Sequence, residues 1–190
     1  LRFRQLPLQS LTRDEESPIA VIERQRVLRC NSAAGAAGVR ESMDPATARA
    51  LCDDPAITLL PRDPQREHSA LLTLGQWAYS ITPTLYPWRG DCLLLEIGRC
   101  LRLAGGLESL LQRVDLELAR RMPGALRAVA ETPKAAWLLS FAGEAQALQH
   151  RLPIGKRLAP LPLGWLEPLC PEVSELARTG LTTVGDLLAL

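Results

Sequence analysis

The amino-acid sequence predicts an α/β fold in which helices back a β-sheet, with a smaller helical unit near the end of the chain. Apolar runs of strand length alternate with amphipathic stretches of helical period. Two acidic residues that are followed at once by proline mark helix starts. After a proline-rich stretch only helical patterns follow. A length of 190 residues suits one large domain or two small ones.

The composition is that of a globular protein. Hydrophobic residues make up 47%, charged residues 23%, and the formal net charge is +1. This balance argues against disorder and against capture of nucleic acid by overall charge, so a polyanion would have to bind locally. No apolar run approaches the roughly 18 residues of a membrane span, and no leader opens the chain, so we expect a cytoplasmic protein with no membrane partner. Because the chain lacks an initial Met and stops within a helical pattern, we expect a fragment of a longer protein.

The cysteines predict neither a metal site nor a disulfide framework. The chain has five cysteines without a CxxC pair and two histidines, which makes a zinc constellation improbable. We expect reduced thiols, mostly buried, and no cofactor.

The first elements are predicted to be strands. LRFR alternates apolar and basic residues with the period of a half-buried strand, which Pro7 ends. Residues 19–23 (IAVIE) and 26–30 (RVLRC) suit a hairpin, although Arg24 and Gln25 are not favoured turn residues.

Helix signals follow this hairpin. A short helix is expected from Asn31 through NSAAGAAGV, and Asp44 caps a second helix that begins with proline. Asp63 caps a third, which runs through Trp77. Strands are then expected at Thr84–Tyr86 and Cys92–Ile97.

The strongest helical pattern follows Gly105 and Gly106. Apolar residues recur at helical spacing from Leu107 to Leu118 and predict a helix packed on a core. LRAVAET is then expected to form a strand and PKAAWLLSFAG a helix. A linker is expected near residues 150–162. Beyond it, PEVSELARTG should form a helix that ends at Gly180, and a capping box from Thr183 to Asp186 should open another.

The order of these segments resembles the Y-family of translesion DNA polymerases and, within it, the polymerase-like ImuB group of bacterial mutagenesis cassettes. The resemblance covers nearly the whole chain and depends on these segments: PIAVIE with RVLRCNSAAGAAGVRESM, DPQREHSALLTLGQWAYSITPTLY, DCLLLEIGRCLRLAGGLESLLQRV, ETPKAAWLLSFAG and GLTTVGDLLAL. It implies a palm sheet backed by helices, small helical fingers and the start of a helical thumb. The implied ranges are 1–9 for the first palm strand, 10–62 for the fingers, 63–155 for the rest of the palm, and 156–190 for a partial, helix-hairpin-helix-like thumb.

The sequence departs from this family where the family holds its metal ions. The two metal-holding aspartates of the first strand correspond to Arg2 and Arg4. The Asp-Glu pair of the later strand corresponds to Asp91 and Cys92.

The residues that would contact the incoming nucleotide are also mostly replaced. The tyrosine and arginine of the fingers that grip the triphosphate correspond to Ser32 and Gly35, and the aromatic residue that screens the sugar corresponds to Pro7. Of the nucleotide contacts implied by the resemblance, Lys134 is retained.

These replacements predict a protein without metal-dependent polymerase chemistry. Nucleotidyl transfer needs two divalent ions about 4 Å apart, held by carboxylates. Magnesium can be held by one or two carboxylates plus substrate phosphates, so Asp91 alone does not forbid it. A guanidinium about 4 Å from a metal charge is disfavoured by roughly 4 kcal/mol per unit charge at an effective dielectric near 20, so Arg2 and Arg4 would displace the ions.

Each candidate residue also has a structural explanation. Arg2 and Arg4 either lie on a solvated strand face or grip DNA or an internal acid. Asp91 is a vestigial ligand, a turn residue or the partner of an arginine, and Cys92 is expected to be buried. Lys134, at a helix start, is either a phosphate contact or a solvated lysine.

Two further sites are candidate nucleic-acid contacts. The turn from Gly180 through Thr182 to Gly185 resembles a hairpin whose backbone amides hold DNA phosphates, although the surrounding segment is acidic. Trp88, between Pro87 and Arg89, is a candidate surface contact.

The predicted function is a non-catalytic scaffold in damage-induced (SOS) mutagenesis and translesion synthesis. The resemblance implies as partners a RecA-like ImuA-type protein, an error-prone replicative-type DNA polymerase and the sliding clamp, the last through segments outside this chain. Binding of primer-template DNA is expected to be weak and salt-sensitive. One alternative is an active nucleotidyltransferase that uses Glu96, which on a strand would face away from Asp91. The other is an α/β interaction module with no nucleic-acid role.

Overall fold

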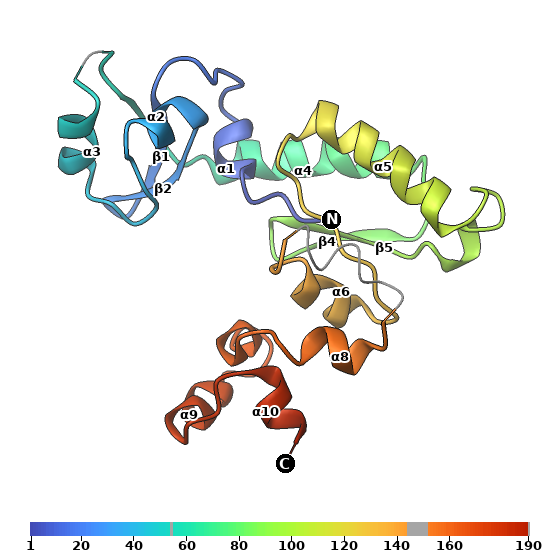
Figure 1. Ribbon diagram of the computed structural model, residues 1–190. Coiled ribbons are helices and arrows are strands. Elements are labelled where there is room, and N and C mark those ends of the chain that lie inside the picture. Colours follow the sequence, from blue (N-terminus) through green and yellow to red (C-terminus); the bar gives the residue numbers. More distant parts are fainter. Residues whose placement is uncertain (54, 144–151, 190) are drawn as a thin grey trace. The chain divides into compact units, whose positions relative to one another are not determined.

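The computed structural model describes residues 1–53, 55–143 and 152–189 (Figure 1). The chain forms two compact units. One unit is continuous and spans Phe3–Gly124, and the other joins Leu1–Arg2 to Ala125–Leu190. Each unit is described separately below.

The first sheet of the Phe3–Gly124 unit contains the predicted hairpin. Strands β1 (Ile19–Glu23) and β2 (Arg26–Cys30) pair antiparallel, and β3 (Thr58–Pro61) joins β1 in parallel. The turn residues Arg24 and Gln25 both adopt positive φ, 49° and 59°. This is the conformation that a tight hairpin turn demands, at a cost of roughly 1–2 kcal/mol for each non-glycine residue. Strand β3 was not predicted.

Two short helices, both predicted from the sequence, contact this sheet. Helix α2 (Ser32–Ala36) begins where the Asn31 side chain accepts a hydrogen bond from the Ala34 amide at 3.0 Å. Helix α3 (Pro45–Leu51) begins where Asp44 accepts one from the Ala46 amide at 2.8 Å. Small apolar residues of the helices and sheet form one core: Ala20, Val27, Ala34, Val39, Ala48, Cys52 and Ile57.

The second sheet lies against a long helix. Helix α4 (Pro64–Ala78) is capped by Asp63 and buries Leu71, Leu74 and Ala78. It contacts both strands of an antiparallel pair, β4 (Leu85–Trp88) and β5 (Cys92–Leu95). Both strands were predicted, but β5 ends earlier than expected, because a 3-10 helix, η1 (Gly98–Cys100), follows it closely.

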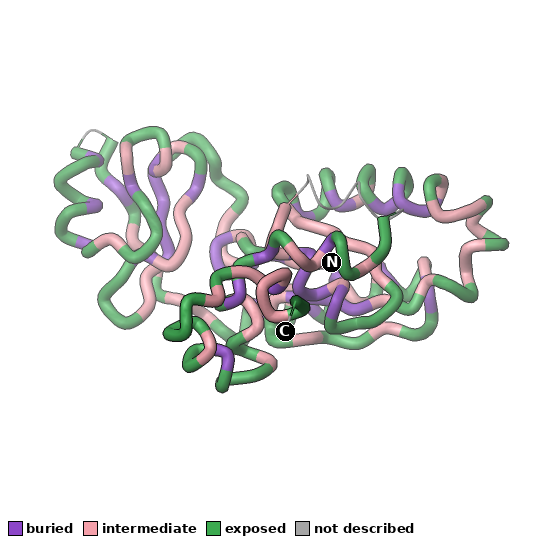
Figure 2. Tube along the Cα trace, turned by 60° about the horizontal axis from the view of Figure 1, so that its bottom comes forward, coloured by how far each residue is buried: buried purple, intermediate pink, exposed green. Residues whose placement is uncertain are grey.

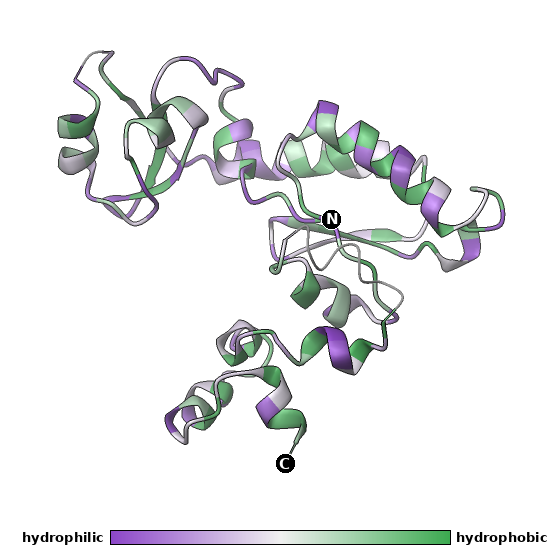
Figure 3. Ribbon diagram, viewed as in Figure 1, coloured by the Kyte–Doolittle hydropathy of each residue, from purple (hydrophilic) through white to green (hydrophobic). Residues whose placement is uncertain are grey.

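Helix α5 (Leu107–Arg121) confirms the strongest helical pattern of the sequence. Its buried residues are Leu110, Leu111, Val114 and Leu118. Hydrophobic and hydrophilic residues alternate around this helix (Figure 3). Buried positions occur in β1, in β5 and along one face of α5 (Figure 2).

The predicted strand at the N-terminus is reduced to one bridge. Arg2 pairs antiparallel with Leu126, and helix α1 (Leu6–Gln9) begins four residues later. Pro7 lies in the first turn of α1, because its fixed φ suits a helix start and it has no amide for a β-ladder.

The prediction of a strand over LRAVAET is therefore wrong except at Leu126. The residues that follow have no regular secondary structure. The Val129 carbonyl accepts a hydrogen bond from the Arg157 side chain at 2.6 Å, where a strand would use a neighbouring backbone amide.

The described part of the second unit contains helices and two isolated bridges. Its helices are α6 (Pro133–Leu139), α8 (Ile154–Leu158), η2 (Leu163–Leu166), α9 (Val173–Arg178) and α10 (Val184–Leu188). The expectation of a linker over 150–162 is corrected, because α8 lies within it and buries Arg157; residues 150 and 151 lie outside the described part. The capping box at Thr183 and Asp186 is confirmed. No helix among the described residues is both long and apolar enough to cross a bilayer.

Candidate functional site

Asp91 lies at the start of β5, beside the N-terminal segment. A turn with positive φ at Arg89 (52°) and Gly90 (77°) joins β4 to Asp91. The Asp91 carbonyl accepts a hydrogen bond from the Phe3 amide at 2.8 Å. The fold therefore brings the backbone of Phe3 to Asp91.

The side chain of Cys92 is directed toward Asp91. Its Sγ lies 3.1 Å from Asp91 Oδ1, and the residue is 1% exposed, which confirms that this thiol is buried. Asp91 itself is partly exposed. A thiol is a soft ligand and a carboxylate a hard one, so this pair is poorly matched to magnesium.

Arg4 belongs to a charged cluster formed with Arg29 and Glu41. The Glu41 carboxylate lies 3.6 Å from Arg4 Nη2 and 2.9 Å from Arg29 Nη1. Arg29 Nε also donates to the Arg4 carbonyl at 2.7 Å. We call these three residues the Glu41 cluster; it ties the N-terminal segment to β2. Of the alternatives open for Arg4, the structure shows the pairing with an internal acid.

The electrostatic argument from the sequence is therefore revised at Arg4. The repulsion of a metal ion was derived for an uncompensated guanidinium, whereas the carboxylate of Glu41 offsets part of the Arg4 charge. The argument against a metal ion at this position now depends on the lack of a carboxylate at position 4.

Arg2 lies in the other unit and stacks on an aromatic ring. Its guanidinium carbon is 3.6 Å from the centroid of the Phe141 ring, a cation–π contact. Its backbone exchanges hydrogen bonds of 2.7 and 2.8 Å with Leu126. The Phe141 ring also contacts Trp137 and Trp165, with centroids 4.8 and 5.4 Å away. The Arg2 side chain therefore packs on aromatic residues of its own unit.

The residues present do not fit the two-metal site that Y-family polymerases use. Within the described ranges, no group of three or more His, Cys, Asp or Glu side chains is placed to hold a metal ion. The alternative acid, Glu96, is exposed beyond the far end of β5, with its carboxylate beside Gly98. It does not complete a pair with Asp91.

Lys134 is exposed at the second position of α6, directly after Pro133. The Thr132 side chain caps this helix by accepting a hydrogen bond from the Ala135 amide at 3.3 Å. A phosphate contact at Lys134 stays a prediction.

The amides of Gly180, Thr182 and Gly185 are used within the protein. Gly180 donates to the Ala177 carbonyl at 3.3 Å, Thr182 to Asp186 Oδ2 at 2.9 Å, and Gly185 to the Ala159 carbonyl at 2.8 Å. These bonds give the turn a structural role. Contacts with DNA phosphate at these residues stay predictions, and they would compete with internal hydrogen bonds.

Close packing explains the glycine at 185, and hydrogen bonding explains the acid at 186. A Cβ on Gly185 would lie 3.0 Å from the Ala159 carbonyl oxygen, so a larger residue would push against backbone. The amides of Thr182 and Thr183 donate to the Asp186 carboxylate and lower its pKa to about 2.

Trp88 forms an aromatic pair with Tyr86 on β4, and this partner was missed in the sequence. The two rings meet edge to face with centroids 6.5 Å apart, and Arg89 lies 5.7 Å from the Trp88 ring centroid. Tyr86 is 45% exposed. The alternation of aromatic residues at 86 and 88 was the available signal. No comparable signal marked Glu41 or Phe141, because both are distant in sequence from the residues that they contact.

The chain is similar in sequence to known proteins. The model described as the impB/mucB/samB family matches residues 7–140. Protein ImuB of Caulobacter vibrioides strain NA1000 / CB15N is 32% identical over 143 residues, which are 75% of this chain and 31% of that protein. The matched segment therefore spans about a third of that relative.

Solved polymerases share the fold. The insertion ternary complex of Dbh DNA polymerase has a TM-score of 0.69 at 14% identity, and the match covers all of this chain and 59% of that one. The Y-family DNA polymerase chimera Dbh-Dpo4(243-245)-Dbh has a TM-score of 0.54 at 13% identity, covering 75% of this chain and 45% of that one. These likenesses confirm the predicted α/β fold of the Y-family polymerase type.

Proposed function

Because the chain belongs to the impB/mucB/samB family as a Y-family polymerase-like protein of the ImuB type, we propose that it acts without catalysis, as a scaffold in DNA-damage-induced (SOS) mutagenesis and translesion synthesis. The observation that carries the proposal is the pairing of Asp91 with the Cys92 thiol at 3.1 Å, where a polymerase of this fold needs a pair of acids. A scaffold role accounts for a polymerase fold that is kept without its carboxylates.

The argument for lost catalysis depends on the number of acids. Two divalent ions must be held against their mutual repulsion while the attacking and leaving oxygens are clamped. Arg4, which pairs with Glu41, and Arg2, which stacks on Phe141, supply no ligand. Asp91 with substrate phosphates provides too few negative ligands for two ions.

The partners and domain boundaries are parts of the same proposal. We expect the whole protein to act in the cytoplasm with a RecA-like ImuA-type protein, an error-prone replicative-type DNA polymerase and the sliding clamp, and to hold primer-template DNA weakly. The polymerase-like body comprises palm (1–9 and 63–155), fingers (10–62) and a partial thumb (156–190). Lys134 and the turn at Gly180, Thr182 and Gly185 are the proposed phosphate contacts.

A primer-extension assay on the full-length protein tests the lack of catalysis. We expect no nucleotide incorporation with either magnesium or manganese, under conditions in which an active Y-family polymerase extends the same primer. The proposal would be overturned if the wild type incorporates nucleotides and the Asp91→Asn variant does not. That result would show that Asp91 still holds a metal ion.

The internal use of the amides at Gly180, Thr182 and Gly185 favours a second candidate, an interaction module that does not bind nucleic acid. Fluorescence anisotropy of labelled primer-template DNA at low salt separates the two. A rise in anisotropy that falls with added salt supports the scaffold on DNA. A flat titration of the full-length protein supports the interaction module.

A further inference from the structure

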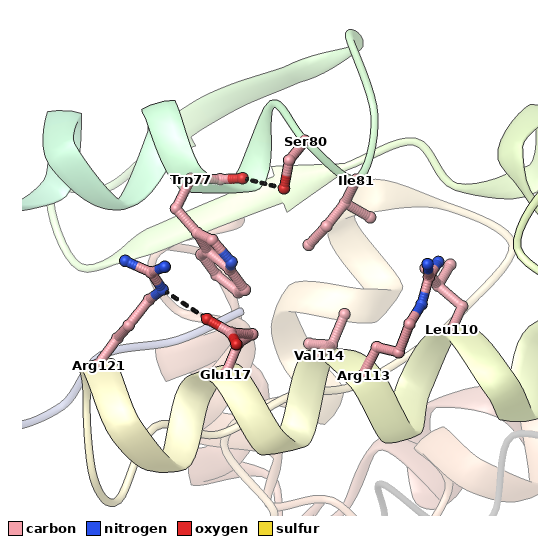
Figure 4. A pocket seen from close by; sticks show the side chains of 8 residues that line it. All are labelled: Trp77, Ser80, Ile81, Leu110, Arg113, Val114, Glu117 and Arg121. Atoms are coloured by element: carbon pink, nitrogen blue, oxygen red, sulfur yellow. Dashed lines mark hydrogen bonds and ion pairs between the residues drawn. The ribbon is translucent and has the colours of Figure 1, made fainter.

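A cleft lies between the end of α4 and the face of α5 in the Phe3–Gly124 unit (Figure 4). Its volume is about 300 Å³. None of the residues that line it belongs to the site at Asp91, so an inference about this cleft stands independently of the proposed function.

The interior of the cleft is apolar. Leu110 and Val114 of α5 are 1% and 6% exposed and form its floor, and Ile81, just beyond α4, is half-buried beside them. The Trp77 side chain points from α4 toward α5 and forms one wall (Figure 4). The four side chains together make a site for one large apolar group, with an aromatic face on one side.

The rim of the cleft is cationic. Two arginines, Arg113 and Arg121, line it together with one carboxylate, Glu117. Arg121 Nε bonds Glu117 Oε2 at 3.0 Å and its guanidinium carbon lies 5.5 Å from the Trp77 ring centroid. Glu117 is also 3.7 Å from Arg120. The one acid on the rim is therefore shared by two arginines, while the exposed Arg113 forms no ion pair with any described residue.

We propose that this cleft docks a short acidic peptide segment of a partner protein, which inserts one aromatic or large aliphatic side chain and places a carboxylate against Arg113. The apolar interior accounts for the inserted side chain. The uncompensated charge of Arg113 accounts for the carboxylate, because a charge-assisted hydrogen bond to a guanidinium is stronger than one between neutral groups. Anchoring by one buried side chain with a charged neighbour is a common way for a small interface to gain affinity.

A nucleotide fits the same cleft less well. A base that stacked on Trp77 would place its polar edge against Ile81, Leu110 and Val114, which offer no hydrogen-bonding side chain. Its phosphate would meet the Glu117 carboxylate beside Arg121. A peptide side chain such as Phe or Leu has no polar edge to satisfy, so the peptide is the occupant that the cleft favours.

Selection from a phage-displayed library of random 12-residue peptides on the immobilised full-length protein tests this proposal. We expect enriched peptides to combine an acidic residue with a large apolar one, and a synthetic copy to bind with an affinity that replacing either residue by Ala lowers at least tenfold. The Arg113→Glu and Ser80→Trp variants should each weaken binding at least tenfold, by charge reversal and by filling the cleft. Both changes are at exposed positions and should leave the fold intact, which circular dichroism checks.

The matched control is Arg102→Glu, an exposed arginine in the loop before α5 that does not line the cleft. This variant should bind the selected peptide like the wild type. Enrichment of peptides without an acid, a failure to enrich any peptide, or equal weakening by Arg102→Glu would each overturn the proposal. A second result would also overturn the proposal. If fluorescein-labelled oligo-dT of 20 nucleotides binds the wild type, and if Arg113→Glu and Ser80→Trp abolish that binding, the cleft is a site for nucleic acid.

Discussion

Two arginine–carboxylate clusters in the Phe3–Gly124 unit have the same chemistry but different surroundings. In the Glu41 cluster, the acid binds Arg4 and Arg29 while its side chain is 48% exposed. In the second, which we call the Glu67 cluster, Arg62 binds Glu67 through two hydrogen bonds of 2.6 and 2.7 Å and Glu23 through one of 3.0 Å. The side chain of Glu67 is only 6% exposed.

This difference in burial predicts that the two clusters contribute unequally to the stability of the fold. Exposed ion pairs contribute little to stability, whereas breaking a buried pair leaves an uncompensated charge and costs several kcal/mol. Arg4 therefore lies in the cluster that is expected to contribute little to stability.

The largest effect should follow from breaking the Glu67 cluster. Glu67→Gln removes the negative charge that raises the pKa of Arg62 and leaves that guanidinium with Glu23 alone. We expect the free energy of unfolding to fall by about 3 kcal/mol, as for other broken buried pairs. Urea unfolding followed by tryptophan fluorescence measures this loss. The matched control, Glu16→Gln at an exposed acid, should change stability by less than about 0.5 kcal/mol.

A smaller effect is expected when the charge of Arg62 is kept but its shape is changed. Arg62→Lys preserves attraction to both acids, yet an ammonium cannot form the two parallel hydrogen bonds to Glu67. We expect a loss of about 1–2 kcal/mol, intermediate between the wild type and Glu67→Gln. A loss equal to that of Glu67→Gln would show that geometry outweighs charge in this cluster.

Breaking the Glu41 cluster should change the free energy of unfolding very little in the same urea-unfolding assay. Glu41→Ala removes the acid between Arg4 and Arg29, and we expect a loss of no more than about 1 kcal/mol, since the pairs are exposed. The loss should shrink further in 1 M salt, where charges are screened within about 3 Å. A loss above that of Arg62→Lys would contradict the comparison and give the Glu41 cluster a structural role.

These two clusters also show what the sequence could predict. Three kinds of feature were predicted, because each depends on residues close together in the chain. They are the helix caps at Asp44 and Asp63, the hairpin of β1 and β2, and the buried apolar face of α5. Asp91 and Cys92, which are adjacent in sequence, were named as candidate site residues, and their side chains are in contact in the structure. Their role in a site stays a prediction.

What the sequence did not predict depends on long-range contacts. Glu41 is 37 residues from Arg4 along the chain, and Phe141 is 139 residues from Arg2. The strand expected after α5 failed for the same reason. A run such as LRAVAET has strand propensity, but a ladder also needs a partner, and past Leu126 a side chain from α8 binds the Val129 carbonyl.

The smallest effect concerns a third kind of carboxylate, one held by backbone amides and not by arginine. Asp186 is half-buried, and donation from the amides of Thr182 and Thr183 lowers its pKa to about 2. A depressed folded-state pKa means that the capping box adds stability above the unfolded-state pKa of about 4 and loses it as the pH falls toward 2.

An NMR titration of the Thr182 and Thr183 amides should therefore show a midpoint near pH 2, and Asp186→Asn should abolish that transition. A midpoint near 4 would mean that the amides do not favour the charged form, and that the turn at Gly180–Gly185 has amides to offer a phosphate.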